Sequence, residues 1–236
     1  MNPRVMIGCP VRNRAWILPR YLECLCRIEY PKDLIEFCFI INNSIDNTEN
    51  ILQHFARDNS SPVRLIKVDI AEEYAHKRGF YSFKHLAFLR NLLLNEFQNS
   101  ACQFLFSVDS DILVPPHSLS RLIQNQCDIV SGLVCNGHHL NDSRIYNILN
   151  WTDNNRLQHV KDFPRDRLFP VDCTGAAYLI SRNVVEGHGI RYSHLMGPED
   201  IGFCMEAAKK GVKIYCDGRI EFIHVMDEPN PNLNPS

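Results

Sequence analysis

The stretch FLFSVDSDI, residues 104–112, is an apolar run that leads directly into two acidic residues. A short apolar run with aromatic and branched side chains predicts a buried strand, here over 104–108. Asp109 and Asp111 would then lie at the carboxyl end of this strand. Because open α/β sheets bind their ligands at that end of their strands, the same stretch also predicts a site.

Apolar runs of the same kind occur on both sides of this stretch, and segments with helical spacing separate them. Leu18, Tyr21, Leu22 and Leu25, for example, would line one face of a helix. Continuous apolar strands that alternate with helices are typical of a parallel sheet covered on both faces, so the first 135 residues predict a Rossmann-like α/β unit. We expect strands at 4–9, 36–41, 63–68, 104–108 and 128–134, and helices around residues 18–25, 51–55, 82–97 and 115–123.

The second half of the chain is less regular. Residues 136–170 are polar and rich in Asn, which predicts a long loop or a small hairpin. We expect strands over 171–180, 212–215 and 220–225, and a helix that Gly211 ends. The expected fold is a single α/β domain over 1–227 with a mostly parallel sheet flanked by helices. The Pro- and Asn-rich tail, 228–236, is expected to be disordered.

The composition excludes several classes of protein. The 236 residues include 25 Lys and Arg against 27 Asp and Glu, so the formal net charge is -2. This near balance argues against a nucleic-acid binder, which relies on a basic surface. No run of 18 apolar residues is present to span a membrane, and we find no apolar segment typical of a signal peptide near the N-terminus.

Ten cysteines are the unusual feature of the composition. Cys9 and Cys38 lie inside apolar runs, and no Cys-x-x-Cys pair is present to indicate a zinc or thioredoxin-like motif. We therefore expect buried free thiols, a reducing compartment and a cytoplasmic location. Cys173 and Cys204 are the two thiols expected closest to the site.

Each of the first four predicted strands ends in a polar cluster, and these clusters are Pro10–Arg14, Asn42–Asp46, Asp69 and Asp109–Asp111. The carboxyl ends of parallel strands share one edge of the sheet, so we expect the four clusters to meet there. The two acids of the last cluster are hard oxygen donors at a spacing that can hold Mg²⁺ or Mn²⁺ together with a phosphate group. The alternative for this pair is a solvated turn.

Four motifs carry a resemblance to a known family. The strand 104–108, followed by Asp109-Ser110-Asp111-Ile112 and Pro115-Pro116, resembles the DxD region of nucleotide-sugar-dependent glycosyltransferases with the GT-A fold. Leu89-Arg90-Asn91-Leu92-Leu93 is similar to the Ala-Arg-Asn helix motif of family 2 glycosyltransferases, and both motifs look closer still to those of fungal mannan-polymerase-type mannosyltransferases. Residues 197–204 resemble the family 2 GED segment with Pro198 inserted, and residues 220–225 resemble the late strand with a metal-binding histidine.

The resemblance implies metal-dependent transfer of a sugar from a nucleotide-diphosphate donor to a hydroxyl of a carbohydrate or other acceptor. It implies that Asp109, Asp111 and His224 hold Mn²⁺ or Mg²⁺. Residues 1–135 would form the nucleotide-binding half, and residues 136–227 the acceptor and catalytic half. Without the other motifs, a lone histidine in an apolar strand would be read as a core residue.

The acidic pair Glu199-Asp200 is the implied catalytic pair. The family pattern gives Asp200 the role of the base that takes the acceptor proton in an inverting transfer, while Glu199 holds the acceptor. The alternative is helix capping, because acids in a first turn stabilise the helix dipole. The mannan-type relatives retain the configuration of the sugar, so a retaining mannosyltransferase-like reaction stays open.

The expected donor site departs from family 2 at Asn42 and Asn43, where the family has two acids, one of which binds uracil. An amide can still bind the edge of a base, so UDP-linked and GDP-linked donors both stay open. Arg90 lies on an apolar helix, where an ion pair with Asp109 is the alternative to a phosphate contact. The donor-binding residues that we expect are Pro10, Arg12, Asn42, Asn43, Ser44, Asp69, Arg90, Asp109, Ser110 and Gly175.

Some residues, and the function as a whole, have further possible interpretations. Trp151 could stack on an acceptor sugar or could anchor a loop by packing. A nucleotidyltransferase would need a Gly-rich loop after the first strand, and residues 8–14 contain a single Gly. A sugar-nucleotide-binding module without turnover stays open, as does a homo-oligomer in which a partner subunit completes the acceptor site.

Overall fold

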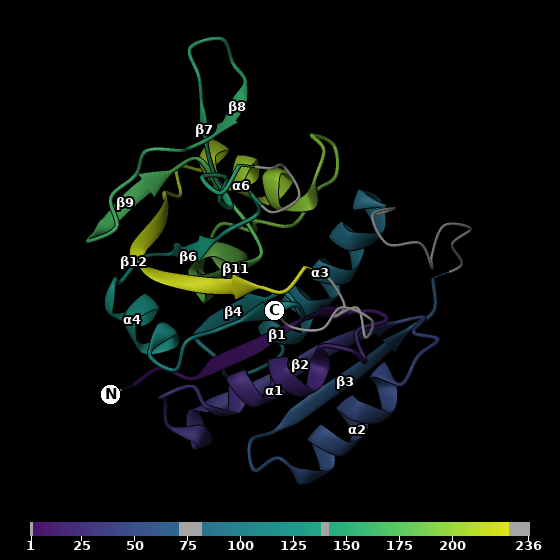
Figure 1. Cartoon of the computed structure of the whole chain (residues 1–236). Helices are drawn as coiled ribbons and strands as arrows, with labels where there is room; N and C mark the ends of the chain where they lie inside the picture. The colour runs from purple at the N-terminus through teal and green to yellow at the C-terminus, as the bar shows by residue number, and fades with distance from the viewer. Residues whose placement is uncertain (1, 71–81, 138–141, 227–236) are drawn as a thin grey trace, which may run out of the picture.

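A nine-stranded mixed sheet forms the centre of the molecule (Figure 1). This computed structural model describes residues 2–70, 82–137 and 142–226. The strands of the sheet are β1 (Val5–Val11), β2 (Ile35–Asn42), β3 (Val63–Val68), β4 (Phe104–Val108), β5 (Ile112–Leu113), β6 (Ile129–Val134), β9 (Leu168–Val171), β11 (Ala177–Ser181) and β12 (Ile214–His224). Their order across the sheet is β3-β2-β1-β4-β11-β6-β12-β5, and β9 also pairs with β12.

Helices cover both faces of this sheet. They are α1 (Leu18–Cys26), α2 (Thr48–Asp58), α3 (Phe83–Gln98), α4 (Ser118–Gln124), α5 (Arg182–Glu186) and α6 (Glu199–Lys209), with a 3₁₀ turn at Lys32–Leu34. Alternate residues of β1 belong to different core clusters. Val5 and Ile7 share a cluster with residues of α1, α2 and α4, while Met6 shares a cluster with residues of α3, α5 and α6. The continuous apolar strands therefore have a partner layer on each side, and the predicted α/β class is confirmed.

The sheet changes direction in its middle. β1 pairs in parallel with β2 and β4, and β2 pairs in parallel with β3. β11 then lies antiparallel between β4 and β6, with Ala177 opposite Val108. Since β11 runs the opposite way, its first residues lie at the carboxyl edge of β4, and this places Gly175 and Ala176 beside Asp109.

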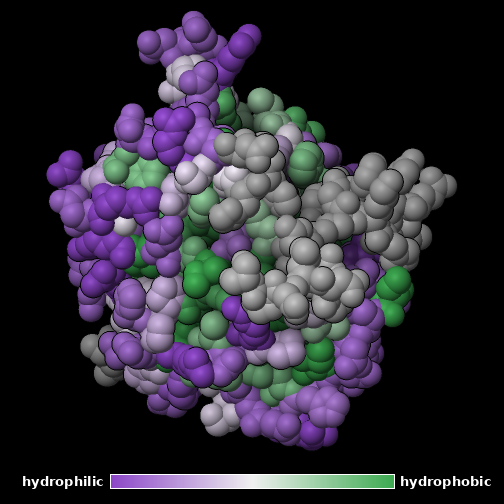
Figure 2. Space-filling view, viewed as in Figure 1, coloured by the Kyte–Doolittle hydropathy of each residue, from purple (hydrophilic) through white to green (hydrophobic). Residues whose placement is uncertain are grey.

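The stretch predicted as a loop or hairpin contains a hairpin. β7 (Ile148–Trp151) pairs antiparallel with β8 (Leu157–His159), and β10 (Cys173–Thr174) joins them in a second, three-stranded sheet. The hairpin projects from the body of the molecule at the top of Figure 1. Figure 2 shows hydrophilic residues around the margin of this face and apolar residues gathered towards its middle.

Several element boundaries differ from the sequence expectation. The strand predicted over 171–180 is divided, because Val171 ends β9 and the rest forms β10 and β11. The break between β10 and β11 lies where Ala176 adopts a left-handed φ of 65° and the amide of Ala177 donates to the carbonyl of Gly175 at 2.8 Å. The two strands predicted over 212–215 and 220–225 are the single strand β12, whose pairing with β6 shifts between Cys216 and Glu221. The short elements β5 and α5 were not predicted. The polar residues 71–81, where the sequence predicts a loop, and the tail expected at 228–236 lie outside the described residues.

The cysteines are free thiols, as predicted. Six are buried and three are half-buried, while Cys26 is exposed. Burial raises the pKa of the Cys38 and Cys216 thiols to about 12, so these thiols act as small apolar core residues. In the part of the chain that the structure describes, no helix is long and apolar enough to cross a membrane.

Candidate active site

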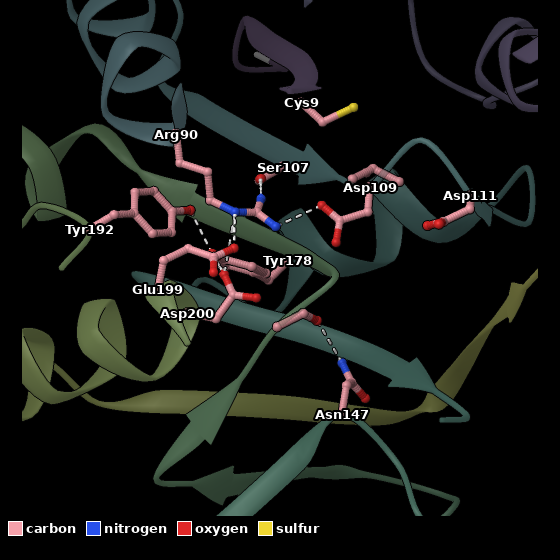
Figure 3. A network of polar contacts seen from close by, with 12 residues as sticks. Cys9, Arg90, Ser107, Asp109, Asp111, Asn147, Tyr178, Tyr192, Glu199 and Asp200 are labelled. Carbon is pink, nitrogen blue, oxygen red and sulfur yellow. Dashed lines mark hydrogen bonds and ion pairs between the residues drawn. The ribbon is translucent and has the colours of Figure 1, made fainter. Parts of the chain in front are cut away.

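Arg90 is the centre of a buried polar network at the carboxyl edge of β4 (Figure 3). Its side chain, 5% exposed, projects from α3 between β4 and the first turn of α6. Nε donates to Oε1 of Glu199 at 2.9 Å, and Nη1 donates to Oγ of Ser107 at 3.2 Å. Nη2 donates to Oδ1 of Asp109 at 2.8 Å, and Oδ1 of Asp200 lies 3.7 Å from Nε. One guanidinium group therefore joins the two acidic motifs of the sequence.

The acids around Arg90 change each other's pKa values. Burial and the nearby carboxylates raise the pKa of Asp109 to about 7, although Arg90 opposes the shift. Burial and Asp200 likewise raise the pKa of Glu199. Burial would lower the pKa of Arg90, but the surrounding carboxylates outweigh it and hold that pKa well above its usual range. Arg90 therefore stays charged and compensates part of the negative charge of the surrounding carboxylates.

Asp111 lies on the other side of the same turn. β5 pairs with the end of β12, so Ile112 is opposite His224 and Nε2 of His224 comes within 3.7 Å of Oδ1 of Asp111. Arg14 donates from Nη2 to Oδ2 of Asp111 at 3.2 Å. The carboxylates of Asp109, Asp111, Glu199 and Asp200 thus contact two guanidinium groups, and the formal surplus of negative charge favours a cation.

The donor set fits a divalent metal in part. Nδ1 of His224 lies 3.0 Å from Oδ1 of Asn136. In the tautomer that donates from Nδ1 to this oxygen, Nε2 would have its lone pair available for a metal beside Asp111. Across residues 2–70, 82–137 and 142–226, no three His, Cys, Asp or Glu side chains gather as a complete metal site. Asp111 and His224 would supply two ligands, and Asp109 is instead paired with Arg90.

Asp200 faces the edge of the site through the space that Gly175 leaves open. A Cβ atom at Gly175 would lie 2.5 Å from Oδ2 of Asp200 and 3.1 Å from its Cγ. The hydroxyl of Tyr178 donates to Oδ1 of Asp200 at 2.8 Å. Both acids of the pair are in the first turn of α6, as the capping alternative requires, but their carboxylates point to Arg90 and Tyr178.

We expect Gly175→Ala to reduce turnover about 10- to 100-fold, because the new methyl group must displace the Asp200 carboxylate and small misplacements of reacting groups cost about that much. The turnover meant is the glycosyl transfer that the sequence motifs imply, measured as release of nucleoside diphosphate from a sugar donor. The control is Gly211→Ala, where no atom lies within 4 Å of the added Cβ but φ is +74°. That variant should lose stability and keep its turnover. Equal turnover in both variants would show that Asp200 does not act at this position.

Two loops at the same edge are tied to each other. The amide of Asn13 donates to Oγ of Ser44 at 3.1 Å, and Oδ1 of Asn13 accepts from the amide of Ile45 at 2.8 Å. The amide of Arg14 donates to Oγ1 of Thr48 at 2.8 Å. Two of the predicted clusters, Pro10–Arg14 and Asn42–Asp46, are therefore brought together as one preorganised surface.

The two asparagines of this surface have different surroundings. Oδ1 of Asn43 accepts from the amide of Ile70 at 2.8 Å, so this side chain holds the end of β3 next to the exposed Asp69. Asn42 is buried at the end of β2, and its Oδ1 has no hydrogen-bond partner among the described residues. Asn42 is therefore the better candidate of the two for the edge of a base.

Comparison with models of protein families matches residues 1–174 of the chain to the family described as Anp1. The chain belongs to the Anp1 family. The predicted resemblance to a GT-A nucleotide-sugar glycosyltransferase of the mannosyltransferase type agrees with this membership.

Two curated relatives extend over nearly all of this Anp1 chain. The human "Procollagen-lysine,2-oxoglutarate 5-dioxygenase 2" is 24% identical over an alignment of 243 residues that covers 99% of this chain and 31% of the relative. A "Glycosyltransferase 25 family member" from Aedes aegypti is 20% identical over an alignment of 252 residues that covers 95% of this chain and 40% of the relative. The chain thus spans less than half the length of either relative.

Solved structures share the fold of this Anp1 protein. The "Mannosyltransferase PcManGT from Pyrobaculum calidifontis in complex with GDP-Man and Mn2+" has a TM-score of 0.64 at 16% identity, covering 98% of this chain and 59% of that one. The structure of "GalNAc-T7 with UDP, GalNAc and Mn2+" has a TM-score of 0.69 at 14% identity, covering 94% of this chain and 44% of that one. These likenesses confirm the GT-A fold.

The remaining residues predicted for the site of this Anp1 protein have varied positions. Pro10 is the last residue but one of β1, Arg12 follows the end of that strand, and Ser110 is buried in the turn between the two acids. Trp151 is 39% exposed at the end of β7, and its amide donates to Asp172, so it lies outside the Arg90 network. An open depression of about 570 Å³ in the same half is lined by Ser143, Arg144, Tyr146, Lys161, Asp162, Phe163 and Arg165.

Sequence reasoning missed several members of this Anp1 site. Asn147 is buried, and its amide group donates to the carbonyl of Gly175 at 2.9 Å and to Thr174 at 3.2 Å, so it fixes the strand break beside Asp200. Tyr178, Tyr192 and Asn136 were also missed. For Tyr178 the available signal was its position inside an apolar run, because a buried tyrosine hydroxyl needs a partner.

Proposed function

We propose that this Anp1 protein is a metal-dependent glycosyltransferase that moves a sugar from a nucleotide-diphosphate donor to an acceptor hydroxyl. The observation that carries the proposal is the Arg90 network, which holds two acidic motifs against each other at the carboxyl edge of the sheet. On one side stand Asp111 and His224, and on the other side stands Asp200. We assign the diphosphate of the donor to the first side and the proton acceptor to the second, and this arrangement supports that assignment.

The proposed step is a displacement at the anomeric carbon. The acceptor oxygen forms the new bond to that carbon, the bond from carbon to the diphosphate oxygen breaks, and its electron pair leaves with the diphosphate. Asp200, with 21% of its side chain exposed, accepts the proton of the acceptor hydroxyl. Glu199 is only 6% exposed, so we assign it to hold Arg90 rather than to contact the acceptor.

The reaction can either invert or retain the configuration at the anomeric carbon. A base at Asp200 implies inversion, whereas membership of the Anp1 family favours the retaining reaction attributed to the mannan-type relatives. The test is the anomeric configuration of the first-formed sugar product, followed by NMR at early times. Inverted product supports the base at Asp200, and retained product contradicts it.

A divalent metal bound by Asp111 and His224 would stabilise the charge of the departing diphosphate. Arg14 would help to hold Asp111 in place, and Asn136 would fix the ring of His224. The solved relatives by fold are recorded with Mn²⁺, which supports the same proposal for this chain.

Chelation with EDTA is expected to stop turnover, and added Mn²⁺ should restore it. We expect His224→Ala to raise the Mn²⁺ concentration for half-maximal turnover at least about tenfold, as loss of metal-site residues usually does. The control is His54→Ala, an exposed histidine on α2 that should behave like the wild type. Full turnover after chelation would remove the metal from the proposal.

The nucleotide is tested by thermal melting with nucleoside diphosphates and Mn²⁺. The structural neighbours are recorded with GDP-Man or UDP, so the two diphosphates are the first candidates. A ligand at 100 times its Kd adds about 2.7 kcal/mol of stability, which corresponds to a rise in Tm of roughly 5–10 °C for a chain of this size. Asn42→Ala should reduce the rise with the preferred nucleotide.

A second part of this experiment separates an enzyme from a binding module. A module would show the rise in Tm but no release of nucleoside diphosphate from the matching sugar donor. If none of the nucleoside diphosphates raises Tm and no donor is turned over, the proposed function is wrong.

A further inference from the structure

Tyr178 is a buried residue of β11 whose hydroxyl contacts Asp200. The side chain has no exposed surface, and its hydroxyl lies 2.8 Å from Oδ1 of Asp200. The hydroxyl of Tyr192 lies 2.5 Å from the hydroxyl of Tyr178 on the other side. Figure 3 shows Tyr178 with Glu199 and Asp200 below the guanidinium group of Arg90, and Tyr192 to the left of that group.

The chemistry of the groups fixes the direction of these hydrogen bonds. A phenol hydroxyl has one proton to donate, and an ionised carboxylate only accepts. Tyr178 must therefore donate to Asp200, and this leaves Tyr192 to donate to Tyr178. Burial raises the pKa of both phenols, that of Tyr178 well above its usual range, so both keep their protons.

Tyr192 is held rigidly from several sides. Its amide donates to Oδ1 of Asn91 at 2.9 Å, and its carbonyl accepts from Nδ2 of the same side chain at 3.0 Å. Its ring stacks on Phe203 with 4.5 Å between the centroids, and Arg90 lies 5.6 Å from its centroid. The row of hydrogen bonds from Tyr192 to Tyr178 and from Tyr178 to Asp200 therefore begins at a rigidly held side chain.

The two oxygens of Asp200 are consequently different. Oδ1 accepts from Tyr178 and lies 3.7 Å from Arg90, whereas Oδ2 lies over Gly175. We propose that Tyr178, backed by Tyr192, is a positioning residue that engages Oδ1 of Asp200 and leaves Oδ2 aimed at the acceptor hydroxyl. This proposal rests on the glycosyltransferase function proposed above, and it adds that one oxygen of the carboxylate is reserved for the reaction.

The test compares Tyr178→Phe with the wild type, using the donor that the melting panel selects and water as the acceptor. We expect kcat to fall about 10- to 100-fold, because Asp200 loses its orientation, while KM for the donor stays within about twofold. Tyr192→Phe, which leaves the contact between Tyr178 and Asp200 in place, should lower kcat by a smaller factor.

The matched control is Tyr30→Phe. Tyr30 is also buried, and its hydroxyl donates to the carbonyl of Pro3 at 2.6 Å, remote from Asp200. This variant should keep the wild-type kcat and KM. A Tyr178→Phe variant that folds and keeps the wild-type kcat would overturn the proposal, as would a fall in donor affinity in place of a fall in kcat. If Tyr178→Phe does not fold, an unchanged kcat in Tyr192→Phe overturns it.

A readout without turnover separates this proposal from the proposed function. Tm is measured without ligands for Tyr178→Phe, for Asp200→Ala, which removes the accepting carboxylate, and for the double variant. If the contact exists, the two losses in Tm are less than additive. A wild-type protein that turns over no donor refutes the proposed function, while additive losses in Tm refute the contact with Asp200 itself.

Discussion

Asp200→Asn is expected to lower turnover by about 10² to 10⁴-fold, the range that a positioned general base contributes. The amide has the shape of the carboxylate but cannot take a proton from the acceptor hydroxyl. Its oxygen can still accept the hydrogen bond from Tyr178, so the local structure should stay in place. Release of nucleoside diphosphate measures the loss, and the rise in Tm with nucleoside diphosphate and Mn²⁺ should remain as in the wild type.

The control for this prediction is Asp58→Asn. Asp58 ends α2 with most of its side chain exposed and paired with Arg57, and its replacement should leave turnover unchanged. Wild-type turnover in Asp200→Asn would remove the base from the mechanism. Together with a retained anomeric configuration, that result would favour the retaining alternative.

Arg90→Met is expected to destabilise the fold by about 3–5 kcal/mol, the usual effect of removing one partner from a buried ion pair. The carboxylates of Glu199, Asp109 and Asp200 would lose the cation that they share. Methionine fills much of the same space, so the loss reports the charge and the hydrogen bonds. Urea denaturation measures the change in the free energy of unfolding, and any variant that folds should have little turnover.

Two further variants sharpen this result. Arg90→Lys should recover only part of the stability, because an ammonium group cannot reach three partners in the directions that the guanidinium group does. Arg57→Met removes an exposed ion pair with Asp58 and should change the free energy of unfolding by less than about 1 kcal/mol. If Arg90→Met is as stable as Arg57→Met, the Arg90 network does not hold the two acidic motifs together.

Local patterns predicted most of the fold. β1 and β4 are continuous apolar runs with a core on each face, and α1 has its apolar residues on one face, so each could be recognised without knowledge of the rest. The break between β10 and β11 could not be predicted in this way. It depends on Asn147 and on the pairing with β4, which are distant in sequence.

The candidate site also has a part that local sequence predicted and a part that it did not. Motifs predicted Arg90, Asp109, Glu199 and Asp200, and an ion pair between Arg90 and Asp109 was one of the alternatives. The contact between Arg90 and Glu199 was not predicted, because it requires α3 and α6 to meet on one face of the sheet. For Asn43 the motif predicted a donor-binding residue, whereas its side chain accepts a hydrogen bond from the amide of Ile70. That contact depends on how the fold brings the ends of β2 and β3 together, which the local sequence does not show.

The place of β11 between β4 and β6 has a consequence for synthesis of the chain. The parallel strands β1 to β4 can pair as soon as residues 1–108 have been made, but β4 then has an open edge until residues 177–181 emerge. Unpaired strand edges promote aggregation, and pairing between distant segments is slow. A nascent or truncated chain that stops before β11 therefore exposes the strand that carries Asp109, and such fragments should be recovered in inclusion bodies.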